Sequence, residues 1–171
     1  MTQLHIFGWA EKEAQRDYIP KSARGGEMAT LVGILLTALF FYAHQARSTG
    51  FFTPGFGASE AFMLYAAILL GMVGPVARMV TGSRNSARLP EMFGSMFWIF
   101  SSILLFFSFP FDFVQFGAVL PNFFRFFVSW ITNDIARVLF AIGSVGGIVF
   151  TVVSAIMYLQ VRNLLRQYLL R

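Results

Sequence analysis

Two aspartates, Asp112 and Asp134, have the residue type and the spacing that could support hydrolysis. They lie 22 positions apart, in the Phe-rich stretch FPFDFVQFGAVLPNFFRFFVSWITND at 109–134. Two carboxyl groups that share one proton can activate a water molecule. Whether these two can do so depends on the elements that would hold them.

The composition places those elements in a membrane. Hydrophobic residues make up 57% of the 171 residues and charged residues only 12%, whereas a soluble domain carries about 25% charged residues. So few charges could not cover the surface of a soluble fold, but a bilayer removes that need. The chain has no Cys and only two His, which excludes iron–sulfur ligation and covalent haem attachment. We therefore expect no cofactor and no metal.

Four apolar runs predict an all-α integral membrane protein, with one domain over 1–171 and four transmembrane helices. A spanning helix needs about 20 residues, and we place the spans at approximately 28–46, 60–80, 91–111 and 135–161. Pro90 should start the third span. Pro110 disfavours helical geometry at Phe109, so this span should kink or end there.

The basic residues predict how the chain is threaded. Ten of the 13 Lys and Arg residues fall on one side of the predicted spans, in the two tails and the loop at 78–90. The other side holds Arg47, Arg125 and Arg137. Because positively charged loops stay in the cytoplasm, we expect both termini to be cytoplasmic. The net charge of +5 comes from the basic residues that flank the spans and orient them in the membrane. We therefore expect no nucleic-acid partner.

A further helix is predicted at approximately 121–132, between the third and fourth spans. The polar residues after Pro121 are Asn122, Arg125, Ser129 and Asn133, and their spacings of 3, 4 and 4 place them in one narrow stripe of a helix. The other faces are Phe, Val, Trp and Ile. Such a helix should lie in the membrane interface on the outer side, or it should pack on the outer ends of the spans.

Polar side chains gather at the predicted outer ends of the spans and form a candidate site. This outer-face cluster consists of His44, Glu60, Asp112, Arg125, Asp134 and Arg137. With Arg47 it contains three acidic and three basic side chains. We expect these charges to pair with one another at helix ends that water reaches.

Small residues predict where helices approach one another closely. Gly143 and Gly147 form a GxxxG pair in the fourth span, and Gly71 and Gly74 are small positions in the second. Pro75 cannot donate a hydrogen bond to the Gly71 carbonyl, so it should bend the second span. The pattern leaves open whether the partner helices belong to this chain or to another.

The layout of Asp112 and Asp134 resembles that of lipoprotein signal peptidase, a family of aspartyl proteases. The resemblance rests on two Asp residues at the outer end of a four-span chain with both termini inside, and it implies a catalytic pair. The chain reads Asn133-Asp134 where the family has Asn-x-Ala-Asp. The family's Gly-Asn and Asp-Arg pairs are missing near Asp112.

The function that these patterns favour is that of a non-catalytic membrane subunit. The central parts of the four runs contain no Asp, Glu, Lys or Arg, whereas pumps and ion-coupled carriers usually keep such a residue near the midplane. We expect the subunit to contact the lipid bilayer and to pack laterally against other membrane subunits or identical copies. The alternatives are a homo-oligomeric channel or carrier lined by Ser, Thr and Gly, and the Asp112/Asp134 hydrolase.

Overall fold

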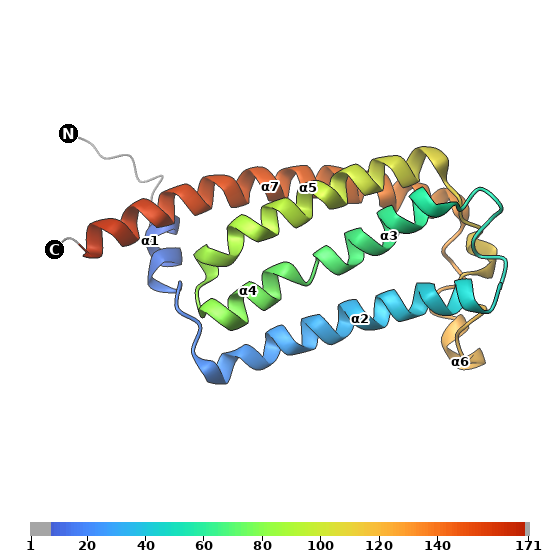
Figure 1. Cartoon of the computed structure of the whole chain (residues 1–171), viewed down its shortest axis with the longest axis horizontal. Coiled ribbons are helices and arrows are strands. Elements are labelled where there is room, and N and C mark those ends of the chain that lie inside the picture. The colour runs from blue at the N-terminus through green and yellow to red at the C-terminus, as the bar shows by residue number, and fades with distance from the viewer. Residues whose placement is uncertain (1–7, 170–171) are drawn as a thin grey trace.

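The structure is a computed structural model that describes residues 8–169 as a bundle of long helices (Figure 1). Four stretches are long and apolar enough to cross a membrane, as the sequence predicts. They are α2 (Gly25–Ala46), α3 (Ala58–Leu70) followed by α4 (Val73–Thr81), α5 (Arg84–Ser108) and α7 (Asn133–Leu169). The short elements are α1 (Gly8–Gln15), η2 (Lys21–Arg24), η3 (Phe113–Gln115) and α6 (Asn122–Arg125).

The bundle has two distinct ends. The aromatic end is formed by residues 47–57 and 109–132, which connect α2 to α3 and α5 to α7. The terminal end is formed by residues 8–24, by the turn at 82–83 and by the last turns of α7 (Figure 1). Both ends of the described chain lie on the same side of the bundle, as an even number of spans requires.

The second span is interrupted at Gly71 and Met72, between α3 and α4. There the N–H of Gly71 donates to the carbonyl of Ile68 at 3.1 Å, in the tighter pattern of a 3₁₀ turn. Pro75 lies in the first turn of α4, where its missing N–H costs no helical hydrogen bond. The predicted bend is therefore a break between two shorter helices.

The third span begins earlier than predicted. Its first residue is Arg84, and the Ser83 hydroxyl accepts a hydrogen bond from the N–H of Ser86 at 3.1 Å, which satisfies the first helical turn. Pro90 consequently lies inside α5 and does not start it. At the other end α5 stops at Ser108, and Phe109 adopts a left-handed φ of 33° before Pro110, which confirms the predicted end.

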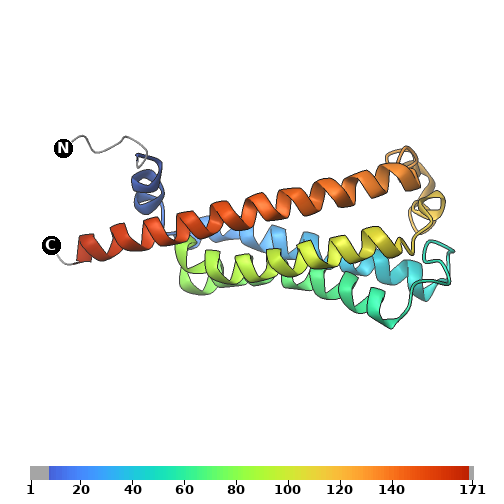
Figure 2. The same ribbon diagram turned by 90° about the horizontal axis from the view of Figure 1, so that it is seen from above.

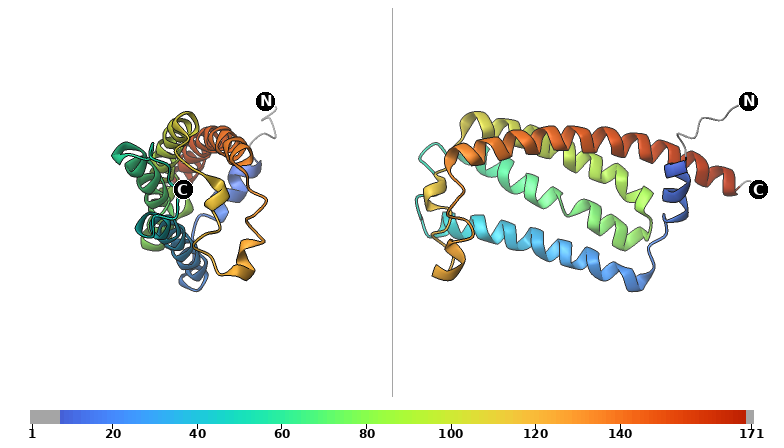
Figure 3. Two further views of the ribbon diagram at one scale, coloured as in Figure 1. Left: turned by 90° about the vertical axis from the view of Figure 1, so that its right-hand side faces the viewer. Right: turned by 180° about the vertical axis from the view of Figure 1, so that it is seen from behind.

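The helices form an array that is open on one side. α5 is the central helix and packs on α7, α4 and α3, whereas α2 packs on α3 and α4. Viewed along the bundle from the aromatic end, α2 and α7 flank a side that the other spans leave uncovered (Figure 3). Among residues 8–169, the segment 109–132 crosses this open side at one end of the bundle and α1 crosses it at the other.

The last helix is much longer than a bilayer requires. α7 has 37 residues, which is about 55 Å at 1.5 Å per residue, against a hydrocarbon core of about 30 Å. Its C-terminal turns extend beyond the other spans, and α1 crosses them there (Figure 2). Ala10 of α1 and Val161 of α7 are fully buried in this region.

Phenylalanine builds the core of the aromatic end. Phe51 is fully buried, and its ring lies 5.5 Å from the ring of Phe111 and 5.2 Å from that of Phe113. Other Phe side chains from both loops and from α2 and α7 pack around it, together with Leu104 and Leu105 of α5. Much of the Phe content therefore holds two long loops together, because edge-to-face and tilted ring pairs pack well around a buried centre.

The predicted helix at 121–132 is much shorter in the structure. α6 covers only Asn122–Arg125, and residues 126–130 continue as turns. Phe123, Phe126 and Phe127 are 66–79% exposed, so most of the apolar surface of this segment does not pack on the described chain. Short helices are marginal without such packing, and this explains the difference.

Candidate functional site

Asp112 and Asp134, which the sequence suggests as a hydrolytic pair, lie in different environments. The Asp112 carboxylate accepts a hydrogen bond from the N–H of Val114 at 3.1 Å and so caps η3. Asp134 lies exposed in the first turn of α7, where a negative charge complements the helix dipole. Between these two carboxyl groups, both in the described part of the chain, no hydrogen bond is present.

The other charges of the predicted outer-face cluster also bond locally. The Glu60 carboxylate accepts from the N–H of Gly57 at 3.1 Å. The Arg137 guanidinium lies 4.5 Å from the centre of the Phe109 ring, in a cation–π contact. Arg125 donates to backbone carbonyls. Within residues 8–169 all three salt bridges lie toward the terminal end, so the expected pairing of the cluster is not met.

His44 is the most deeply placed member of the cluster, with 1% of its surface exposed. Its Nε2 lies 3.1 Å from the Phe116 carbonyl oxygen, which can only accept, so Nε2 carries a proton. Its Nδ1 lies 2.6 Å from the Thr49 hydroxyl. Because that hydroxyl can donate, a neutral imidazole satisfies both contacts. His44 thus joins the end of α2 to both loops.

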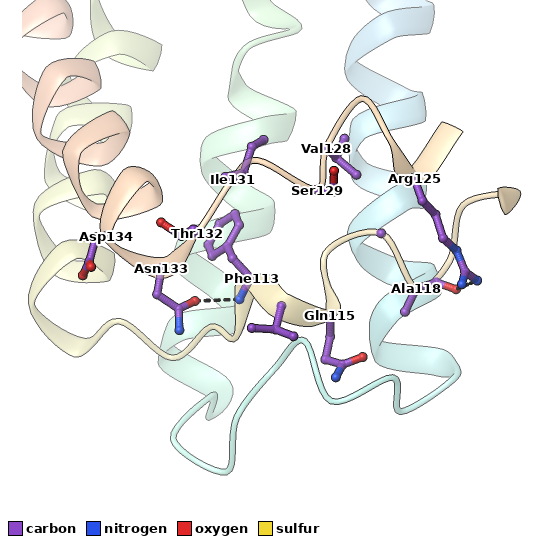
Figure 4. A pocket seen from close by; sticks show the side chains of 12 residues that line it. Phe113, Gln115, Ala118, Arg125, Val128, Ser129, Ile131, Thr132, Asn133 and Asp134 are labelled. Carbon is purple, nitrogen blue, oxygen red and sulfur yellow. Dashed lines mark hydrogen bonds between the residues drawn. The ribbon is translucent and has the colours of Figure 1, made fainter. Parts of the chain in front are cut away.

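A cavity of about 580 Å³ lies at the aromatic end, beside η3 and the turns that follow α6 (Figure 4). The Asn133 side-chain oxygen accepts a hydrogen bond from the N–H of Phe113 at 2.7 Å, which joins the start of α7 to η3. Arg125 and Asp134 lie on opposite sides of the cavity (Figure 4). Polar side chains between them are Gln115, Ser129, Thr132 and Asn133.

An apolar cavity of about 230 Å³ adjoins the polar one on the side of the middle of the bundle. Phe113 and Ile131 line both cavities. The remaining lining residues are Trp98, Phe116, Ala136, Leu139 and Phe140. The two cavities together form a site that is polar at the aromatic end and apolar toward the midpoint of α5.

A second group of charges, which the sequence reasoning missed, joins three spans near the terminal end. Arg78 of α4 lies between two carboxylates: its Nε is 2.8 Å from Glu27 of α2, and its Nη1 pairs with Glu91 of α5. A Cβ at Gly74 would overlap the side chain of Glu91, which would have to move. These charges lie within the helices, one or two turns from their ends, so a search of the central parts of the runs could not find them.

The same charges lie between two further cavities. One of about 320 Å³ opens among the spans and is lined by Thr30, Ser95, Trp98 and Phe150, among others. Another of about 290 Å³ lies among the charged side chains of the terminal end. Arg78 and Glu91 line both. The ion group therefore separates an apolar hollow from a polar one.

The N-terminal segment is fastened to the start of α5. The Asp17 carboxylate accepts from the N–H of Asn85 at 2.6 Å and from the Ser83 hydroxyl at 2.9 Å. Glu13 of α1 forms a salt bridge with Arg88 at 2.8 Å. Glu13 and Asp17 precede the first span and form no recognisable sequence motif. Their roles as ion-pair partner and helix cap become visible only in the fold.

The predicted packing glycines lie at helix contacts within this chain. A Cβ at Gly147 would lie 2.7 Å from Cγ1 of Ile99 on α5, and one at Gly143 would lie 3.7 Å from Trp98 Nε1. A Cβ at Gly71 would lie 3.6 Å from Ile34 of α2. The Ser95 and Thr151 hydroxyls, 3.0 Å apart, add a hydrogen bond between α5 and α7.

Comparison with known protein families, with curated proteins and with solved structures finds no match to this chain. The chemistry of its sites must therefore be judged from geometry alone. Neither the cavity at the aromatic end nor the ion group presents a nucleophile held by a base, or a pair of carboxyl groups sharing a proton.

Proposed function

We propose that the protein is a non-catalytic integral membrane subunit that packs laterally against other membrane helices through the open side of its bundle. The observation that carries the proposal is a small-residue face of α2 that no other part of the described chain covers. Around Gly26 and Gly33 there is open space where a side chain would project. A small face of this kind lets a neighbouring helix approach closely in a membrane.

The hydroxyl groups of this face leave it free for packing. Thr30 donates to the Gly26 carbonyl at 3.1 Å, and Thr37 donates to the Gly33 carbonyl at 2.9 Å. Gly26, Thr30, Gly33 and Thr37 are separated by four, three and four positions, so they share one face of α2. Thr30 also lines the 320 Å³ cavity. The face therefore borders the hollow among the spans.

The same observations weigh against the two alternatives. In a channel or carrier lined by hydroxyl groups these groups would donate to the transported species, but Thr30 and Thr37 donate to their own helix and Ser95 bonds to Thr151. A hydrolase with an aspartate pair needs both carboxyl groups on one water, but Asp112 caps η3. Lateral packing needs neither free hydroxyl groups nor a pair of carboxyl groups.

For the orientation we propose that the terminal end lies in the cytoplasm. The support is the excess of basic residues in the two tails and in the loop at 78–90, because positive loops remain inside. The aromatic end then meets the opposite interface, where aromatic side chains are commonly enriched.

The experiment is native mass spectrometry after gentle extraction, with Gly33→Leu as the test variant. The wild type should leave the membrane with fixed partners, and Gly33→Leu should lose them while keeping its thermal unfolding temperature. Val32→Leu is the matched control, because Val32 is 50% exposed and lies more than a quarter turn from the small face.

The other outcomes identify the alternatives. A ring of identical copies that conducts ions in liposomes would support the channel. Peptide hydrolysis that Asp112→Asn and Asp134→Asn both abolish would support the hydrolase. A wild-type chain that leaves the membrane alone, with lipid only, would refute the subunit proposal.

A further inference from the structure

We infer that the paired cavities at the aromatic end bind one zwitterionic phospholipid, with its headgroup in the polar cavity and one acyl chain in the apolar cavity. The ligand class follows from the lining: a cation, an anion and neutral polar groups at one end, and aromatic and aliphatic side chains at the other. This inference does not depend on a protein partner.

The polar cavity can recognise both charges of such a headgroup. The Arg125 guanidinium donates from Nε to the Leu120 carbonyl at 3.1 Å and from Nη2 to the Ala118 carbonyl at 3.3 Å. These bonds fix the side chain and leave Nη1 without a partner in the described structure. A guanidinium has five N–H donors, so it can also bind a phosphate oxygen.

Asp134 supplies the opposite charge on the other side of the same cavity (Figure 4). Its carboxylate attracts an ammonium group and repels a second negative charge. A headgroup that carries a phosphate and a primary amine complements both sides, whereas one that carries only a phosphate complements Arg125 alone. The 580 Å³ volume leaves room for neutral contacts with Gln115 and Ser129.

The lining of the apolar cavity includes residues that lie at different depths of one leaflet. It reaches Trp98, which lies ten residues before the end of α5 at Ser108, about 15 Å along the helix axis. This is half of a hydrocarbon core of about 30 Å. One acyl chain in this cavity would therefore contact Ile131 near the interface and Trp98 near the midplane.

The surroundings of the site match a lipid that enters from the bilayer. The turns after Pro121 expose Phe123, Phe126 and Trp130 by 69%, 79% and 59%. Aromatic side chains of this kind insert at the headgroup level of a membrane. They would hold the wall of the polar cavity at the depth where phospholipid headgroups lie.

The headgroup is tested by native mass spectrometry of delipidated protein with added palmitoyl-oleoyl phosphatidylethanolamine. We expect one tightly bound molecule per chain, with Arg125→Gln weakening it by about tenfold, the loss of one charge-assisted hydrogen bond. Arg47→Gln, an exposed arginine outside the lining, is the matched control. Phosphatidylglycerol should bind more weakly than phosphatidylethanolamine, and Asp134→Asn should abolish that preference.

Binding of the acyl chain is tested by substitutions that fill the apolar cavity. Leu139→Trp should weaken phosphatidylethanolamine binding, while Val138→Trp, at a neighbouring exposed position outside the lining, should not. Glycerophosphoethanolamine, which has the headgroup without chains, should not bind at the same concentration. Dioleoylglycerol, which has the chains without phosphate, should not bind either.

Several results would overturn the inference. Equal binding of dioleoylglycerol, or unchanged binding by Arg125→Gln, would refute phosphate recognition. A Leu139→Trp variant that binds like the wild type would refute the chain site. Circular dichroism and thermal unfolding of each variant separate lost binding from lost folding, and a folded wild type that retains no phospholipid would refute the site as a whole.

Discussion

The imidazole of His44 donates a hydrogen bond from Nε2 to the Phe116 carbonyl at 3.1 Å, across a sequence separation of 72 residues. The other ring nitrogen of His44 meets Thr49. One side chain at the end of α2 therefore joins both loops of the aromatic end, and Phe40, Phe51 and Phe116 pack around it. A buried polar side chain that is fully bonded fixes its surroundings in one arrangement.

Replacement of His44 should loosen the aromatic end. His44→Phe keeps a ring of similar shape but leaves the Phe116 carbonyl and the Thr49 hydroxyl without their partner, and such a loss costs about 1–3 kcal/mol. Thermal unfolding in detergent should show the decrease, with Arg47→Gln as the exposed control. An unchanged unfolding temperature would mean that water replaces the imidazole at no cost.

Gly147→Leu should destabilise the isolated chain. Its side chain would meet Ile99, whose Cγ1 lies 2.7 Å from an added Cβ, and overpacking of a tight contact costs about 1–3 kcal/mol. Val149→Leu is the control, because Val149 is 57% exposed. Unfolding in detergent measures both. If Gly147→Leu unfolds like the wild type, α5 and α7 do not pack as described.

Removal of Arg78 should cost more stability than removal of either of its partners. Arg78→Met leaves Glu27 and Glu91 without a cation, whereas Glu27→Gln leaves one ion pair. Breaking a fully buried pair costs about 3–5 kcal/mol. These side chains keep 17–23% exposure, so we expect on the order of 1–3 kcal/mol.

Arg84→Met is the control for this series, since Arg84 makes no salt bridge within residues 8–169. The measurement is the free energy of unfolding in a detergent titration. Equal losses for Arg78→Met and Glu27→Gln would show that the second carboxylate contributes nothing to the group.

The threading is tested with single cysteines in a chain that contains none. Ser48→Cys lies at the aromatic end and Ser86→Cys near the terminal end, and both positions are exposed. A membrane-impermeant maleimide added to intact cells should label Ser48→Cys and should label Ser86→Cys only after permeabilisation. Labelling of both from outside would refute an even number of spans between two cytoplasmic termini.

The sequence predicts the spans well because each is a long apolar run, and this signal is local. Pro110 and Pro75 also act locally: α5 ends two residues before Pro110, and the second span is interrupted in the turn that precedes Pro75. The helix at 121–132 was overestimated because a polar stripe indicates periodicity but not a packing surface. For the Phe residues, composition alone does not distinguish a lipid-facing ring from the buried ring of Phe51.

The candidate sites were harder to predict because they depend on distant positions. The polar cavity combines Arg125 and Asp134, both in the predicted cluster, with neutral side chains that no motif marks. The ion group joins Glu27, Arg78 and Glu91, which are separated by 51 and 13 positions. Only helix packing brings charges this far apart to one guanidinium.

The break at Gly71 and Met72 has a consequence for how the molecule meets bilayers of different thickness. A continuous helix that is too long for a membrane tilts, kinks or thickens the bilayer locally. α3 is tied to the aromatic end through Leu64 and Ile68, and α4 is tied to the ion group through Arg78. We expect the 3₁₀ turn between them to be the place where the second span kinks when the bilayer is thinner than the span.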